Sequence, residues 1–129
     1  RQMCIRDSYN LIDKEPRALA HLYETSNNLL WSHIANLNQI ACFDKMRGIY
    51  MPLISPTPEV LKDIQDICVL QDKLYALTSN AIVELKMEKN ADEIRLTAQP
   101  LIDIKTKVLK LYNNEDILCA LTVENQILL

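Results

Sequence analysis

The sequence predicts an all-β chain built from repeated antiparallel units of four strands. The first observation is a residue pattern that recurs at a spacing of 44 residues, in segments 28–34, 72–78 and 116–122. Each segment opens with Asn or Asp, has Leu two positions later and ends in a β-favouring residue. The second observation is an Asn-x-Ile sequence shortly after each segment, beginning at Asn38, Asn80 and Asn125.

Asparagine and aspartate mark the expected reversals of the chain around each repeated segment. Both residues tolerate the left-handed backbone conformation and form side-chain turns, so they are typical of hairpin loops. Each repeated segment is therefore predicted to be a strand between two hairpin turns, the first of them at Asn28, Asp72 or Asp116. The chain has one glycine, Gly48, and these polar residues can supply the turn conformations in place of glycine.

Further apolar stretches complete each unit. They lie upstream at 18–23, 64–70 and 108–112, and downstream at 40–43 and 49–54 in the first unit and at 82–87 and 94–101 in the second. Four antiparallel strands in about 44 residues is the size of one blade of a β-propeller. We therefore expect a partial propeller over residues 17–129, after a connection at 9–16. Its three blades are expected at about 17–56, 60–101 and 106–129, the last one incomplete.

The hydrophobic pattern changes across a unit as stacked blades require. Segment 117–121 is continuously apolar, as expected of an inner strand that is covered on both faces. Segment 93–97 alternates between apolar and polar residues, as expected of an outer strand. Residues 55–62 are interpreted as a connection between blades that could begin a short helix, with Thr57 as cap and Pro58 in the first turn.

The first eight residues are predicted not to belong to the native protein. Segment 1–8 reads as the translation of a transposase-type sequencing adapter, CGT-CAG-ATG-TGT-ATA-AGA-GAC-AGN. Native sequence is expected to begin near Tyr9, and the apolar run at 127–129 is untypical of the end of a finished domain. We therefore expect the chain to be a fragment of a longer protein.

The repeat resembles a degenerate WD-repeat propeller over about residues 17–129. In a WD blade the third strand ends with a Trp-Asp pair, and Phe43-Asp44 stands in that place in the first unit. The second unit has Leu85-Lys86 there, and no Gly-His pair precedes a first strand. The resemblance implies a eukaryotic scaffold, similar to the propellers that precede helical solenoids in large coat, tether, nuclear-pore and kinetochore proteins.

The composition indicates a folded globular protein. Hydrophobic residues make up 49% of the chain and charged residues 24%. No apolar stretch approaches the roughly 20 residues needed to cross a bilayer, so no membrane insertion is expected. The formal net charge of −3 becomes −4 without residues 1–8, since basic residues fall from 14 to 12 and acidic residues from 17 to 16. That balance argues against nucleic-acid binding, which needs a basic surface.

Three of the four cysteines, Cys42, Cys68 and Cys119, are expected in the native sequence, whereas Cys4 falls in the adapter. None of the three belongs to a C-x-x-C pair, and each is flanked by apolar residues. They are predicted to be reduced, buried thiols, which places the protein inside the cell, in the cytoplasm or the nucleus.

No catalytic, cofactor-binding or metal-binding residue is predicted. A single glycine excludes the glycine-rich phosphate loops and the serine nucleophile elbow. His21 and His33 are 12 residues apart, which matches no metal-ligand spacing on a helix or hairpin. His33 is predicted to be a core histidine with a satisfied ring, because Leu77 and Leu121 hold its place in the other units.

Aromatic and acidic residues are given structural roles. Trp31 and Tyr75 share one repeat position and are predicted to pack between blades rather than to form an aromatic binding platform. The acidic residues Asp63 and Asp66, and those at 92–93 and 115–116, are interpreted as solvated carboxylates in turns.

The predicted function is a non-catalytic protein–protein interaction scaffold, with other proteins and the remainder of its own propeller as partners. One alternative is a fragment of a propeller enzyme whose channel active site lies mostly outside this chain. The loops expected to enter first strands, 57–59 and 102–105, share no residues in common, which favours the scaffold over the enzyme. A second alternative is a small stand-alone α+β protein of unknown function.

Overall fold

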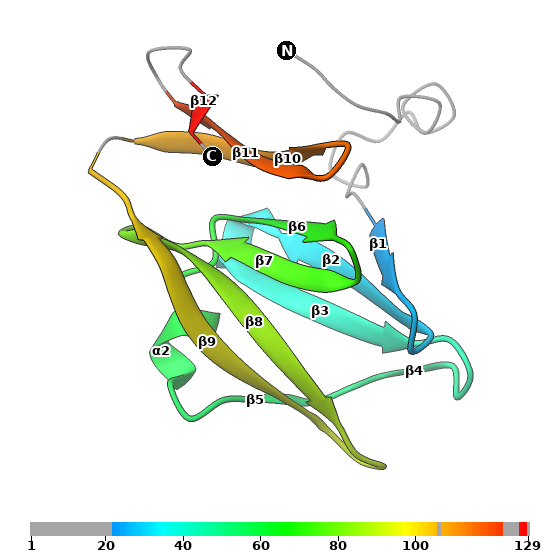
Figure 1. The fold of residues 1–129 in the computed structure, drawn as a ribbon. Coiled ribbons are helices and arrows are strands. Elements are labelled where there is room, and N and C mark those ends of the chain that lie inside the picture. The colour runs from blue at the N-terminus through cyan, green and yellow to red at the C-terminus, as the bar shows by residue number, and fades with distance from the viewer. Residues whose placement is uncertain (1–21, 106, 123–126, 129) are drawn as a thin grey trace.

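The computed structural model describes residues 22–105, 107–122 and 127–128, which form three sheets of predominantly antiparallel strands (Figure 1). The described residues are thus all-β, as predicted, and the α+β alternative is wrong for them. The predicted adapter (1–8), the predicted connection (9–16), His21 and Asn125 lie outside the described residues.

The first sheet contains four strands in chain order, with every neighbouring pair antiparallel. They are β1 (Leu22–Thr25), β2 (Leu29–Ile34), β3 (Gln39–Asp44) and β4 (Ile49–Tyr50). The repeated segment 28–34 therefore forms the second strand, as predicted. Asn28 has φ +65° just before β2, and Asn38 has φ +55° after the short 3₁₀ helix η2 (Ala35–Leu37), so both are left-handed turn residues.

The second sheet repeats this arrangement and adds one parallel strand at its edge, in the order β5-β9-β8-β7-β6. Its strands are β5 (Leu53–Ile54), β6 (Asp66–Leu70), β7 (Lys73–Leu77), β8 (Ala81–Lys89) and β9 (Ile94–Asp103). The turn between β6 and β7 consists of Gln71 and Asp72, with φ of +51° and +66°. Two consecutive positive φ angles are typical of the tight turn that suits a two-residue hairpin.

The prediction of a single strand over 49–54 is wrong, because the chain passes there from one sheet to the next. Met51 N still donates to Cys42 O of the first sheet at 2.8 Å. Pro52 has no N–H to continue that pairing, and its carbonyl instead accepts from Ile94 N of β9 at 2.9 Å. Segment 49–54 is thus divided into β4 in the first sheet and β5 in the second.

The third sheet contains β10 (Val108–Asn114), β11 (Ile117–Thr122) and β12 (Ile127–Leu128), in that order. The repeated segment 116–122 again supplies the second strand. Its left-handed turn residue is Glu115, with φ +57°, and not the predicted Asp116. The three turns differ in length and conformation: 26–28 is a three-residue loop with Asn28 left-handed, 71–72 has both residues left-handed, and 115–116 has only Glu115 left-handed.

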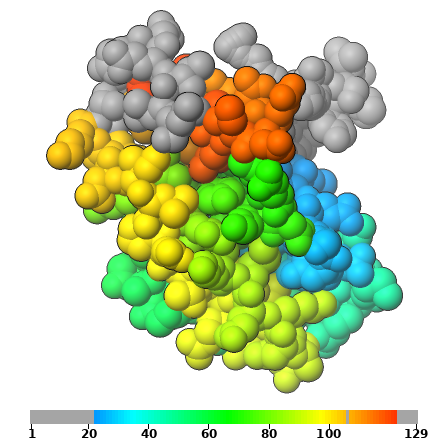
Figure 2. All heavy atoms as spheres, viewed as in Figure 1, coloured from blue at the N-terminus to red at the C-terminus, as the bar shows by residue number. Residues whose placement is uncertain are grey.

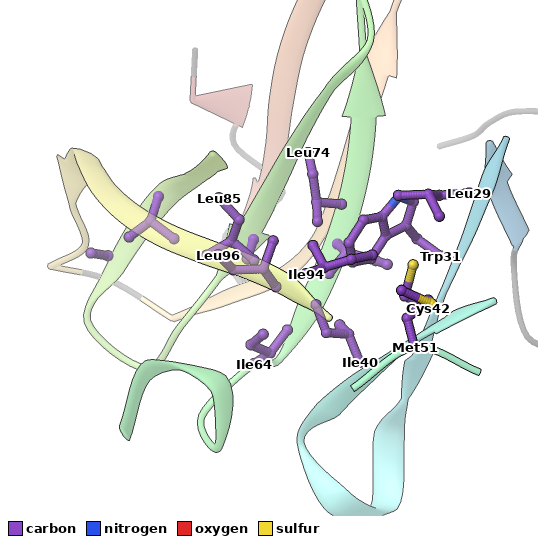
Figure 3. Packing of buried hydrophobic residues seen from close by; sticks show 14 residues of the cluster. Leu29, Trp31, Ile40, Cys42, Met51, Ile64, Leu74, Leu85, Ile94 and Leu96 are labelled. Carbon is purple, nitrogen blue, oxygen red and sulfur yellow. The ribbon is translucent and has the colours of Figure 1, made fainter. Parts of the chain in front are cut away.

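The three sheets stack face to face, and the second sheet is covered on both of its faces. Its contact with the first sheet encloses a large apolar core that includes Trp31, Leu74 and Ile94 (Figure 3). A smaller core lies between the second and third sheets, formed by Cys68, Leu77, Ile82, Leu111 and Ala120. In Figure 2 the atoms of β10 and β11 lie directly against β6 and β7. Strand β7 shows the two-sided burial expected of an inner strand, whereas in 117–121, the segment on which that prediction was made, Ile117 is 47% exposed.

The connection between β5 and β6 contains one short helix, α2 (Pro58–Leu61), with Pro58 in its first turn as predicted. Thr57 does not cap this helix with its side chain, so that detail is wrong. Its N–H instead donates to Ser55 Oγ at 3.1 Å, which holds Thr57 in a local turn. The outer strand β9 alternates as predicted, with Ile94 and Leu96 buried and the residues after each of them exposed.

Candidate functional site

The turn between β7 and β8 separates two open pockets at one end of the second sheet. Thr78 fixes this turn, because its buried Oγ1 lies 3.1 Å from both the N and the O of Ala81. Thr78 N also donates to Ala81 O at 2.8 Å, which closes the turn through the backbone. The turn is therefore rigidly held and presents Ser79 and Asn80 at its exposed tip.

Asp63 ties this turn to the segment that follows α2. Its carboxylate accepts hydrogen bonds from the N–H of Ser79 at 3.0 Å and the hydroxyl of Ser79 at 2.6 Å, and from Gln65 Nε2 at 3.0 Å. Burial alone would raise the pKa of Asp63, but the hydrogen bonds from Ser79 and Gln65 outweigh it and hold the pKa below its ordinary value. The prediction of a freely solvated turn carboxylate is wrong for Asp63.

We define the basic pocket as the cavity of about 380 Å³ on one side of this turn, between the second and third sheets. Leu77, Ile104 and Val108 form its apolar part, and Lys105 and Lys107 contribute ammonium groups. The other described lining residues are Gln65, Thr78 and Ser79, so none of them is a carboxylate. The pocket can therefore hold an apolar group beside an anionic one.

We define the acidic pocket as the cavity of about 510 Å³ on the other side of the turn, between α2 and the outer strands of the second sheet. Its apolar surface comes from Val60, Ala81, Val83, Ala98 and Pro100. Glu59 and Asp63 line it, together with the uncharged Thr57, Thr78 and Asn80. The two pockets thus share the Thr78 turn and carry charges of opposite sign.

Lys105 and Lys107 were not predicted as site residues, and 102–105 was predicted to be a loop. Strand β9 continues as far as Asp103. Its pairing with β8 extends past a bulge to the last pair of partners, Ala81 and Asp103. Only the residues after Asp103 belong to the connection that leads to the third sheet. The sequence offered one signal for this pocket, namely two lysines within the short interval 104–107. It did not connect them with Leu77, which lines the same pocket but is distant in the sequence.

Polar contacts across the two interfaces involve aspartates that the sequence placed in turns. Asp72 Oδ1 accepts from Ser26 N at 2.6 Å and its Oδ2 from Ser26 Oγ at 2.5 Å, which joins the first two sheets. Asp66 is on strand β6 rather than in a turn, so its interpretation as a solvated turn carboxylate is wrong. It accepts from Leu111 N of the third sheet at 2.8 Å. The acidic residues at 92–93 and 115–116 do lie in turns, and three of those four are exposed, Glu93 being half-buried.

Asp44 closes the turn between β3 and β4. Its side chain has no exposed surface, and Oδ1 accepts from Met46 N at 2.9 Å. Lys89 Nζ of the second sheet forms an ion pair with Oδ2 at 3.2 Å. Burial would raise the pKa of Asp44, but the Lys89 ammonium and the N–H groups of Arg47 and Met46 lower it further than burial raises it. Asp44 thus joins two sheets through Lys89.

The three described cysteines are free and buried, as predicted. Burial, followed by the negative charge of Asp44, raises the pKa of the Cys42 thiol to about 12, although Lys89 opposes this. Burial also raises the pKa of Cys119. A raised pKa favours the protonated thiol, whereas the thiolate is the reactive form of cysteine.

The histidine and the two aromatic residues at the repeat positions have structural partners. Trp31 is fully buried, and its Nε1 donates to Thr25 Oγ1 at 3.2 Å, so it is a core residue as predicted. Tyr75 is half-buried beside the core between the second and third sheets. His33 Nε2 lies 2.7 Å from the carbonyl O of Ile64, so the ring is satisfied, but it is half-buried because it lies near the end of β2.

Within residues 22–105 and 107–122, no group of three His, Cys, Asp or Glu side chains is arranged to hold a metal ion. No helix in that part of the chain is long and apolar enough to cross a membrane. Comparison with protein-family models, with curated proteins and with solved structures found no match.

Acid is expected to destabilise the protein through Asp63, whose folded-state pKa lies below the ordinary value of 3.8. When the pKa of a carboxyl group is lower in the folded than in the unfolded protein, the ionised group stabilises the fold. This stabilisation is complete above the pKa of the unfolded state and is lost as pH falls through the pKa of the folded state. In Asp63→Asn this contribution is absent at every pH. The urea midpoints of wild type and variant should therefore differ more at pH 7 than near about pH 3. An equal difference at both values would contradict this role of the carboxylate.

Proposed function

We propose that the three sheets are consecutive blades of a β-propeller within a longer protein, and that this propeller is a non-catalytic scaffold for other proteins. The observation that carries the proposal is the stacking of the second sheet between two apolar cores. The second strand of each sheet recurs at a spacing of 44 residues, which supports a common repeating unit. Asp44 at the end of a third strand supports the WD-like class.

The scaffold function is supported by the two pockets beside the Thr78 turn. Each combines apolar side chains with charges of one sign, as a surface that recognises a protein segment requires. Burial raises the pKa of the Cys42 and Cys119 thiols, and the carboxylates of Asp63 and Asp72 are occupied by hydrogen bonds that join structural elements. These groups serve packing, so protein binding accounts for them better than catalysis does.

The sequence on either side of this chain tests the proposal. Reading the coding sequence outward in both directions, with adapters trimmed, should reveal about one to five further units of this type, because propellers usually have four to eight blades and three are proposed here. A helical repeat region behind them would strengthen the scaffold assignment. A start codon directly before Tyr9 together with a stop codon directly after Leu129 would contradict it.

Residues 9–129 expressed alone are expected to aggregate. The outer face of the first sheet carries Leu22 and Tyr50, which are 66% and 72% exposed, beside the half-buried Leu30 and Phe43. In a propeller the neighbouring blade covers such a face, and without it the apolar side chains and strand edges associate. Light scattering after size-exclusion chromatography measures this. A monomer with a sharp, reversible thermal transition would contradict the expectation.

A further inference from the structure

We propose that the basic pocket binds an acidic segment of a partner protein and takes up one apolar side chain of that segment. This inference rests on the proposed scaffold function and names the chemistry of the partner. The pocket lies where the second and third sheets meet, so both sheets contribute to it. Leu77 comes from the end of β7 and Val108 from the start of β10, with Ile104 in the connection between the sheets.

The apolar part of the pocket fits a side chain such as leucine. Leu77 belongs to the core between the second and third sheets, and Ile104 and Val108 pack against that core while remaining partly exposed. A volume of about 380 Å³ lies within the range of pockets that enclose small ligands. A leucine side chain that enters it loses contact with water and extends an existing apolar core, which favours binding.

The charged part of the pocket favours an anion. Lys105 and Lys107 are both exposed, and neither forms an ion pair with a carboxylate of the described residues. Other lysines of the chain are engaged in this way, as Lys45 is with Glu24 and Lys110 with Asp66. The two ammonium groups therefore remain available to carboxylates of a partner.

The neighbouring carboxylate does not neutralise these lysines directly. Asp63 does not line the basic pocket and forms no ion pair with either lysine, and its carboxylate accepts hydrogen bonds from Ser79 and Gln65. A protein segment fits the basic pocket better than a nucleic acid does. Two lysines beside apolar side chains do not make the extended basic surface that a phosphate backbone needs, and the chain is acidic.

Fluorescence anisotropy of the full-length protein with a fluorescein-labelled Asp-Asp-Leu-Glu-Glu peptide tests the proposal. The double variant Lys105→Glu with Lys107→Glu should bind about tenfold more weakly, because two attractions become repulsions. The matched control is Lys73→Glu with Lys86→Glu, which makes the same charge change at exposed positions of the second sheet away from the pocket. This control should bind as wild type does. Circular dichroism verifies that both variants fold.

Two further probes separate the contributions. Replacing the peptide leucine with serine should weaken binding by about tenfold, since the leucine side chain gains free energy from burial and the serine side chain does not. Binding should also weaken as salt rises, because the lysines are exposed. A single-stranded RNA oligonucleotide that binds more tightly than the peptide would overturn the proposal in favour of nucleic acid. Equal loss in both double variants would also overturn it, since net charge alone would then explain binding.

Failure of this inference and failure of the proposed function give different results. If the longer protein forms a propeller but the Lys105 and Lys107 double variant binds the peptide as wild type does, only the peptide site is wrong. If peptide binding depends on the two lysines but no further blades exist, only the propeller is wrong.

Discussion

Replacing Trp31 with alanine is expected to destabilise the contact between the first and second sheets by about 3–5 kcal/mol, the usual cost of truncating a buried tryptophan. Trp31 has no exposed surface and extends from β2 toward Leu74 and Ile94 of the second sheet (Figure 3). The truncation removes the largest of the fully buried side chains and leaves a cavity between two sheets that cannot easily close. Thr25 Oγ1 also loses the hydrogen bond that Trp31 Nε1 donates.

Native-state hydrogen exchange of the full-length protein measures this effect locally. Amides of β2 and β7 should exchange faster in Trp31→Ala, whereas Met46→Ala should change their exchange little. Met46 lies in the turn after β3 of the first sheet and is 76% exposed, so its loss should cost less than about 0.5–1 kcal/mol. Equal protection in the two variants would mean that Trp31 does not join the sheets.

Leu111→Ala should have the corresponding effect on the contact between the second and third sheets. Leu111 has no exposed surface and packs in the core with Leu77, Ile82 and Ala120. Truncation of a buried leucine costs about 2–5 kcal/mol, with the larger values where the cavity stays open. Amides of β10 and β11 should therefore exchange faster, while those of β2 and β3 should keep their protection, since the first sheet does not contribute to this core.

The chain supplies a matched control in Leu109→Ala. Leu109 is on the same strand as Leu111, and its replacement by alanine removes the same atoms, but its side chain is 52% exposed. We expect its effect on the exchange of β10 and β11 to be within about 0.5–1 kcal/mol. If Leu109→Ala and Leu111→Ala weaken protection equally, the third sheet is not packed on the second through Leu111.

The strands and the burial of the repeated segments could be predicted because local chemistry determines them. Asn28 and Asp72 have the left-handed conformation that their side chains tolerate, and the apolar segments between the turns form second strands. Trp31 is buried as expected because a large aromatic residue on an inner strand has a neighbouring sheet on which to pack.

The errors in the predicted fold arise where tertiary pairing decides the outcome. The break of segment 49–54 at Pro52 depends on the amide of Ile94, which is distant in the sequence. The shift from Asp116 to Glu115 occurs in a turn of the same length as 71–72, where Asp72 is left-handed, so residue type and turn length do not determine it by themselves. Neither feature follows from hydrophobic periodicity, because that pattern records burial and not the partner strand.

The candidate site could not be predicted because it is assembled from separated segments. Asp63 and Ser79 are 16 residues apart and meet only after the connection packs against the turn. Lys105 and Lys107 acquire a role only through their position next to Leu77, at the junction of two sheets. The sequence indicates where charges and turns occur. The pocket, however, depends on which loops come together when the sheets stack.

The structure of the full-length gene product tests the central proposal most directly. We expect the three sheets to be consecutive blades of a closed ring, with a further sheet covering Leu22 and Tyr50 on the outer face of the first sheet and another covering the outer face of the third. A monomeric protein in which either face stays open to solvent, with no further sheet packed on it, would contradict the propeller.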